Sequence, residues 1–199
     1  MSKQPLGAAR FLVALDIDGV LNAFSRNEHI DDPDDGAYRE WRVDVVEAES
    51  DVYGFARFPI TWSRQMIASL NELFADARVQ LCWLTSWGGQ ARLVAGTTGL
   101  VAARPPVVVP YTKRFSDYQI GKPEGLRKFL TEQPWASAER VAVIDDEVCR
   151  GGYLYELDDV IRGFPDKQWL TIAPNSVRGI SVSEMAELRQ FVGADALPN

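Results

Sequence analysis

The chain has 199 residues, 46% of them hydrophobic, and its 28 acidic and 21 basic side chains give a formal net charge of -7. These values fit one globular domain with its own core, residues 1–199, and the acidity argues against strong non-specific binding to nucleic acid, whose backbone is also anionic. The two cysteines have neither zinc-type nor Cys-x-x-Cys spacing, which excludes a disulfide framework and a zinc site. No apolar run is long enough to span a membrane. Together these features favour the cytoplasm.

The first part of the chain contains one strand, one loop, one hairpin and one helix. The apolar run 11–15 predicts a buried strand, and the acidic stretch 22–37 predicts an exposed loop. Residues 41–46 and 52–58 alternate in polarity and predict a β-hairpin. Thr61 is predicted to cap the next helix. The apolar face expected for that helix consists of Met66, Ile67, Leu70, Leu73 and Phe74.

The rest of the chain alternates between apolar runs and helical patterns. Strands are predicted at 79–84, 107–109, 140–144 and 169–172. Helices are predicted at 89–95, 122–132 and 182–192. The last of these opens with a capping box at Ser181 and ends before Gly193. This order predicts an α/β protein with a Rossmann-like parallel sheet between two layers of helices.

Polar side chains follow several of these strands directly. In an open parallel sheet, ligands bind at the carboxyl ends of the strands, so these side chains are expected to converge at one edge. A lysine at the start of a helix should reach the same edge. The converging residues are Asp16, Asp18, Thr85, Lys122, Asp145 and Asp146.

This set of side chains suits phosphoryl chemistry. Two or three carboxylates with water make a site for Mg²⁺, which prefers oxygen ligands. Lysine and hydroxyl donors can hold a phosphoryl group and neutralise the charge that develops on it. A carboxylate can attack phosphorus, while a second carboxylate can protonate the leaving oxygen and later deprotonate the attacking water.

Four segments resemble, in order and spacing, the motifs of the haloacid dehalogenase-like (HAD) superfamily. They are Asp16-Ile-Asp-Gly-Val-Leu21, Leu84-Thr85-Ser86, Lys122 before a helix, and Val143-Ile-Asp-Asp146. The stretches Trp83-Leu-Thr-Ser-Trp87 and Asp145-Asp-Glu147 are also similar to the HAD branch related to the "Swiss Army Knife" RNA repair proteins.

The resemblance implies a magnesium-dependent phosphatase with an aspartyl-phosphate intermediate. Asp16 would be the nucleophile and a metal ligand, and Asp18 would be the acid/base and would bind the metal through its backbone carbonyl. Thr85, Ser86 and Lys122 would hold the phosphoryl group. Asp145 would complete the metal site, and Asp146 would bind directly or through water. Which of these two touches the metal stays open, because Ile144 stands where other members have glycine.

Residues 22–60 are long enough for a small hairpin cap inserted after the first motif, which would leave the site open to a phosphorylated small molecule or a nucleic-acid end. Trp87 could stack on a base or a sugar, or pack in the protein. Two other functions stay open: a phosphotransferase or mutase with the same chemistry, and a non-catalytic module that binds phosphate or a partner. The second would be marked by loss of Asp16 or Asp18, and both are present.

Overall fold

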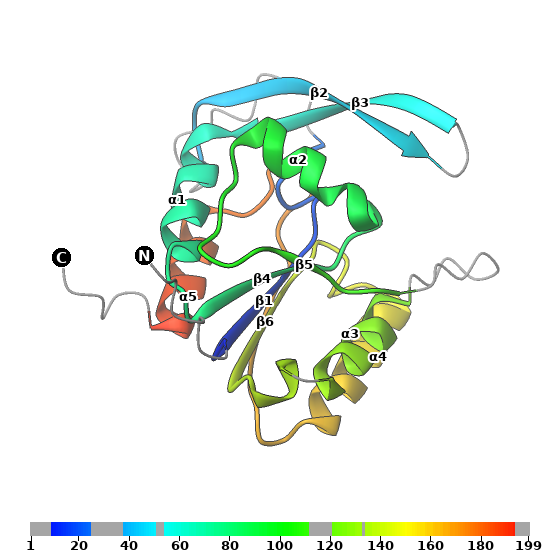
Figure 1. The fold of residues 1–199 in the computed structure, drawn as a ribbon, viewed down its shortest axis with the longest axis vertical. Coiled ribbons are helices and arrows are strands. Elements are labelled where there is room, and N and C mark those ends of the chain that lie inside the picture. The colour runs from blue at the N-terminus through cyan, green and yellow to red at the C-terminus, as the bar shows by residue number, and fades with distance from the viewer. Residues whose placement is uncertain (1–8, 25–37, 51–53, 112–120, 133, 194–199) are drawn as a thin grey trace, which may run out of the picture.

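The protein is described by a computed structural model that covers residues 9–24, 38–50, 54–111, 121–132 and 134–193. Five parallel strands form one sheet in the order β5-β4-β1-β6-β7, so the first strand lies in the middle (Figure 1). The strands are β1 (Phe11–Leu15), β4 (Val79–Trp83), β5 (Val107–Val108), β6 (Arg140–Ile144) and β7 (Gln168–Ile172). The predicted α/β class with a parallel sheet is confirmed.

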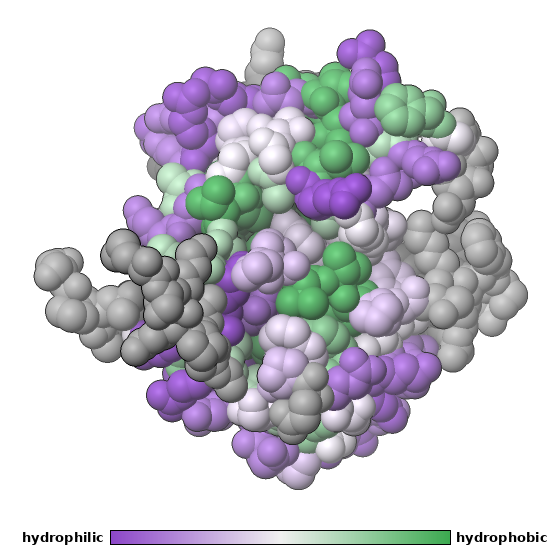
Figure 2. All heavy atoms as spheres, viewed as in Figure 1, coloured by the Kyte–Doolittle hydropathy of each residue, from purple (hydrophilic) through white to green (hydrophobic). Residues whose placement is uncertain are grey.

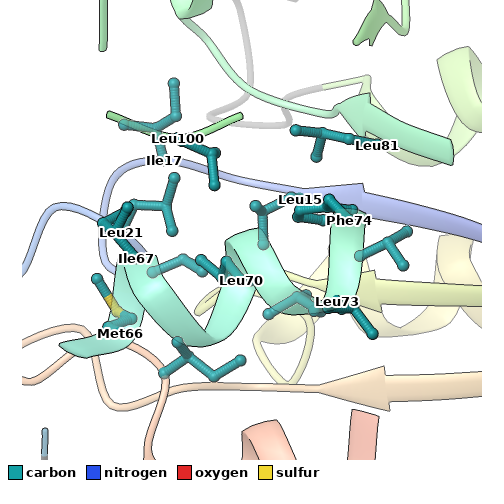
Figure 3. Close-up of a cluster of buried hydrophobic side chains, with 14 of the residues drawn as sticks. Leu15, Ile17, Leu21, Met66, Ile67, Leu70, Leu73, Phe74, Leu81 and Leu100 are labelled. Atoms are coloured by element: carbon teal, nitrogen blue, oxygen red, sulfur yellow. The ribbon is translucent and has the colours of Figure 1, made fainter. Parts of the chain in front are cut away.

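Helices cover both faces of the sheet, because alternate side chains of its central strands point in opposite directions. On one face, Val13 and Leu15 pack with α1 (Arg64–Phe74), α2 (Ala91–Thr98) and α5 (Val182–Val192). Figure 3 shows side chains of α1, among them Ile67, Leu70 and Phe74, in the same buried cluster as Leu15 and Ile17. On the other face, Leu12 and Ala14 pack with α3 (Lys122–Thr131) and α4 (Gly151–Gly163). The two cores therefore lie on opposite faces of the sheet and flank the strands that end at its carboxyl edge.

The start of α1 differs from the prediction, although all five residues of its predicted apolar face are buried. Thr61 does not cap the helix, because it lies within the strand β3 (Gly54–Ser63). Ser63 is the cap instead, and its hydroxyl accepts a hydrogen bond from the Met66 amide at 3.3 Å. Strand β3 and helix α1 follow each other without a loop. The polarity pattern located the strand only as far as residue 58, so the capping residue was predicted two positions too early.

A separate two-stranded antiparallel sheet is inserted after β1. It pairs β2 (Trp41–Ser50) with β3 and is longer than the predicted hairpin. Val46, Ala48 and Ile60 are buried, whereas Val43, Val45 and Phe55 are exposed. Figure 2 shows hydrophobic residues among hydrophilic ones over this hairpin and α2, at the top of the view. The predicted loop 22–37 lies mostly outside the described residues, but Asn22 and Ala23 are buried.

One helix, α4, has no counterpart in the sequence prediction. It begins with two glycines, which are poor helix formers, and its buried residues Tyr153, Leu157 and Val160 follow a helical spacing. That spacing was the available signal. No helix among the described residues is long and apolar enough to cross a membrane.

Candidate metal and phosphoryl-transfer site

The carboxyl ends of β1 and β6 bring a buried charge cluster together. Asp16 follows β1, Asp145 follows β6, and these two strands are neighbours in register. Lys122 is the first residue of α3 and is 2% exposed. Its ammonium donates to Asp16 Oδ2 at 2.6 Å and to Asp145 Oδ2 at 2.7 Å. A solvated lysine at a helix start is therefore excluded, because this ammonium is a buried bridge between two carboxylates.

Each of the two carboxylates has further donors. Asp16 Oδ1 accepts from the Ile17 amide at 2.7 Å. Asp145 Oδ1 accepts from the Glu147 amide at 3.0 Å, and Asp145 Oδ2 accepts from the Tyr153 hydroxyl at 3.1 Å. Tyr153 comes from the unpredicted helix α4, so this support was missed in the sequence. These bonds fix both carboxylates in one orientation.

Asp146 completes the cluster on the side of the loop after β1. Its carboxylate lies so close to Gly19 that a Cβ there would be 2.4 Å from Asp146 Cγ, and Gly19 has a φ of +72°. Its one ion-pair partner among the described residues is the exposed Arg150, at 3.8 Å. Glycine is therefore required at position 19 by both the backbone and the neighbouring carboxylate.

Burial and mutual repulsion change the acidity of the cluster. Burial raises the pKa of Asp16 to about 7, against the opposing effect of the Lys122 charge. Burial alone would lower the pKa of Lys122, but the carboxylates of Asp16 and Asp145 outweigh it, so that pKa is raised and the lysine stays charged. The pKa of Asp146 is also raised, first by burial and then by Asp145.

Oxygen atoms of Asp16, Asp145 and Asp146 all lie within 4.8 Å of one another, so the three side chains could hold a metal ion. The donors are all carboxylate oxygens, as Mg²⁺ prefers. Three carboxylates face one buried lysine, and this excess of negative charge in a buried place favours a bound cation. The residues present therefore fit the predicted ion, although they do not fix which metal it is.

Asp18 lies apart from this cluster. Its Oδ1 accepts from Asn22 Nδ2 at 2.8 Å, and its Oδ2 accepts from Trp87 Nε1 at 2.9 Å. Its side chain is not in the three-aspartate group, and the contribution of its backbone carbonyl to a metal site remains a prediction. Asn22 in turn accepts from the Thr61 amide of β3 at 2.8 Å. Neither donor to Asp18 was identified from the sequence.

Thr85 and Ser86 lie in the loop after β4, the other neighbour of β1. Thr85 is buried, and its Oγ1 accepts from the Trp87 amide at 3.4 Å. Ser86 is exposed and lines a pocket. The predicted phosphoryl-binding role of these two hydroxyls therefore remains a prediction.

This pocket of about 420 Å³ lies between the hairpin and the loop after β4, and Asp18 forms part of its wall. Trp87 and Phe58 provide aromatic surface, with ring centroids 5.3 Å apart and an edge-to-face angle of 69°. Trp87 thus packs in the protein and lines a pocket at the same time. Gln90 ties the hairpin to this loop, because its side chain hydrogen-bonds both the amide and the carbonyl of Glu49.

The loop after β1 is also tied to the segment after β7. The Phe24 amide donates to the Ser176 carbonyl at 2.9 Å, and the Ile180 amide donates to the Val20 carbonyl at 3.1 Å. A Cβ at Gly179 would lie 2.4 Å from that same Val20 oxygen. A segment without any predicted site residue therefore shapes the backbone next to Asp16.

Tyr111 has a buried hydroxyl without a hydrogen-bond partner among the described residues. Burial raises its pKa, with Lys122 opposing and Asp16 and Asp145 adding to the rise. A single tyrosine after an apolar run does not indicate, from sequence, that its hydroxyl will be buried beside charged side chains.

No protein-family model, no curated protein and no solved structure matches this chain. The structure itself shows an α/β fold with three aspartates and one lysine at the carboxyl edge of its central strands.

Proposed function

We propose that the chain is a Mg²⁺-dependent phosphomonoester hydrolase of the HAD type in which Asp16 is the nucleophile. The observation that carries this proposal is the buried cluster itself, where Lys122 bridges Asp16 and Asp145 while Asp146 lies within reach of both. A cluster with this much uncompensated negative charge costs stability, and such a cost is typical of a site kept for binding or chemistry.

In the first step, a carboxylate oxygen of Asp16 forms a bond to phosphorus, and the bond from phosphorus to the leaving oxygen breaks. Asp18 gives its proton to that oxygen, so a neutral alcohol leaves. The hydrogen bonds from Asn22 and Trp87 hold the Asp18 side chain on the pocket side of the site.

In the second step, water attacks phosphorus and gives a proton to Asp18, and the bond from phosphorus to Asp16 breaks. Phosphate leaves, and both aspartates return to their starting state. Lys122, with its raised pKa, stays cationic throughout and balances the charge of the phosphoryl oxygens. A Mg²⁺ ion held by Asp16, Asp145 and Asp146 would supply further charge neutralisation and orient the phosphoryl group.

The test is phosphate release from a panel of phosphomonoesters by wild type and Asp16→Asn, with Mg²⁺ and with EDTA. We expect release by the wild type with Mg²⁺ only, and a rate lower by a factor on the order of 10³ or more in the variant. Circular dichroism of Asp16→Asn should show an intact fold. Lys128→Met is the control for activity, because it changes an exposed side chain of α3, the helix that begins with Lys122.

Other outcomes would replace the proposal. Equal activity in Asp16→Asn would contradict the nucleophile assignment. Transfer of the phosphoryl group to an added alcohol in preference to water would indicate a phosphotransferase. Silence of a folded, Mg²⁺-binding wild type towards the whole panel would favour a non-catalytic binding module.

A further inference from the structure

The pocket next to Asp18 has a wall chemistry that restricts what it can bind. None of its described lining residues is lysine or arginine, and the Asp18 carboxylate bonds the side chains of two of them, Asn22 and Trp87. A second phosphate group in this pocket would meet the negative charge of Asp18 and no cation among the described lining residues. The pocket therefore disfavours a polyanion such as the end of a nucleic-acid strand.

The remaining walls suit a flat ring. Phe58 and Trp87 offer adjacent aromatic surfaces, and the exposed Ser86 offers a hydroxyl. Aromatic surface with a few polar groups is the usual lining of a small-molecule site, and a pocket of about 420 Å³ is within the range of such sites.

Trp87 links this pocket to the chemistry. Its ring packs edge-on against Phe58 of the hairpin, and its single N–H donates to Asp18 Oδ2 at 2.9 Å. The indole N–H can donate a hydrogen bond but cannot accept one, so it needs an acceptor oxygen on Asp18. The bond therefore keeps the Oδ2 atom of the carboxyl group directed towards Trp87. A ring bound against Trp87 would thus lie beside the carboxyl that is proposed to protonate the leaving oxygen.

Resting on the proposed function, we infer that this pocket binds the leaving group of the substrate and selects a ring-bearing group without negative charge. Trp87 is a positioning residue for Asp18, and Phe58 is a specificity-determining residue. The substrate class is then a phosphomonoester of a nucleoside or another ring-bearing alcohol, with one phosphate only.

The test uses steady-state kinetics on four substrates: AMP, phenyl phosphate, glycerol 3-phosphate and adenosine 3′,5′-bisphosphate. The wild type should prefer the first two by about tenfold or more in kcat/KM. Phe58→Leu should raise KM for AMP about 3- to 10-fold, as expected for the loss of an aromatic contact. It should leave KM for glycerol 3-phosphate unchanged. Phe55→Leu, on the same strand but exposed, is the matched control and should change neither.

Trp87→Phe keeps an aromatic wall but removes the N–H. It should lower kcat for AMP by about 10- to 100-fold, as expected for a misplaced acid, with KM within about threefold of wild type. A purely structural role of Trp87 would change KM and thermal stability instead. Equal loss of kcat in Phe55→Leu, or a preference for the bisphosphate, would overturn the inference.

Binding of adenosine, followed by calorimetry, separates this inference from the proposed function. If no substrate is hydrolysed but adenosine binds wild type and Phe55→Leu equally and binds Phe58→Leu about 3- to 10-fold more weakly, the phosphatase proposal fails and the pocket assignment stands. If AMP is hydrolysed with no preference over glycerol 3-phosphate and adenosine does not bind, the phosphatase stands and the pocket assignment fails.

Discussion

The charge cluster and the hairpin are held in place by different forces. Asp16, Lys122 and Asp145 are almost fully buried and bind one another through short charged hydrogen bonds. The hairpin is held by its main-chain ladder and by the buried side chains of Val46, Ala48 and Ile60, and it exposes Val43 and Phe55. Buried charges must be paired to be tolerated, whereas an exposed surface tolerates exchange. Stability and chemistry should therefore respond to changes in the cluster, and substrate preference to changes in the hairpin.

The largest effect is expected from Lys122→Met. The substitution leaves two carboxylates buried without their shared cation, so the free energy of unfolding should fall by about 3–5 kcal/mol. Chemical denaturation in EDTA measures this loss, and Lys128→Met on the same helix should lose less than about 0.5 kcal/mol. A similar loss in both variants would contradict the central position of Lys122.

The next effect is a pH dependence that originates from Asp16. Its pKa is raised to about 7 in the folded protein from an ordinary value of 3.8, so between these pH values the folded metal-free protein holds a proton that the unfolded chain has lost. Stability must then fall as pH rises through this window, by at most about 1.4 kcal/mol per pH unit.

Asp16→Asn removes this titration. Unfolding curves in EDTA at a series of pH values should show a flatter profile for the variant and a higher stability than wild type above pH about 7. Mg²⁺ should stabilise the wild type more than the variant. Parallel profiles for the two proteins would show that Asp16 does not carry the raised pKa.

A smaller effect is expected from Gly19→Ala. Its Cβ would lie 2.4 Å from Asp146 Cγ, so the carboxylate must move, and we expect a loss of about 1–3 kcal/mol together with weaker Mg²⁺ binding. Gly99→Ala is the control, because Gly99 has a φ of +76° but no atom near its Cβ position. It should show the backbone cost alone, about 1 kcal/mol, and unchanged Mg²⁺ binding by calorimetry.

The smallest effect is expected in the hairpin. Gln90→Ala removes two hydrogen bonds to the Glu49 main chain, both in exposed surroundings, and should cost about 1 kcal/mol or less. Hydrogen exchange should speed up at hairpin amides and stay unchanged in β1, because these two bonds join the hairpin to the loop after β4 and do not involve β1. Faster exchange in β1 would indicate that hairpin and cluster are one cooperative unit.

The same contrast decides what could be predicted from the sequence. Strand ends follow from apolar runs, and the carboxyl ends of neighbouring parallel strands share an edge, so the meeting of Asp16 with Asp145 was predictable. Lys122 was predictable as a residue at a helix start directed to that edge, but its bridging position was not. The resemblance to known motifs supplied roles, and these roles remain predictions.

Tertiary contacts between distant segments were not predictable. The bond from Trp87 to Asp18 joins two loops that lie 69 positions apart, and no local pattern encodes it. Helix α4 was missed because Gly151 and Gly152 weaken its helical signal. The cap at Thr61 was wrong because strand pairing with β2, a long-range property, extends β3 to Ser63.

The hydrogen bonds from Phe24 and Ile180 across to the segment after β7 have a consequence for biosynthesis. Asp16 leaves the ribosome early, but the backbone beside it gains these partners only once Ser176 and Ile180 have been made, on the order of ten seconds later at ordinary elongation rates. A nascent chain that carries the whole set of aspartates should therefore bind Mg²⁺ poorly until that segment emerges.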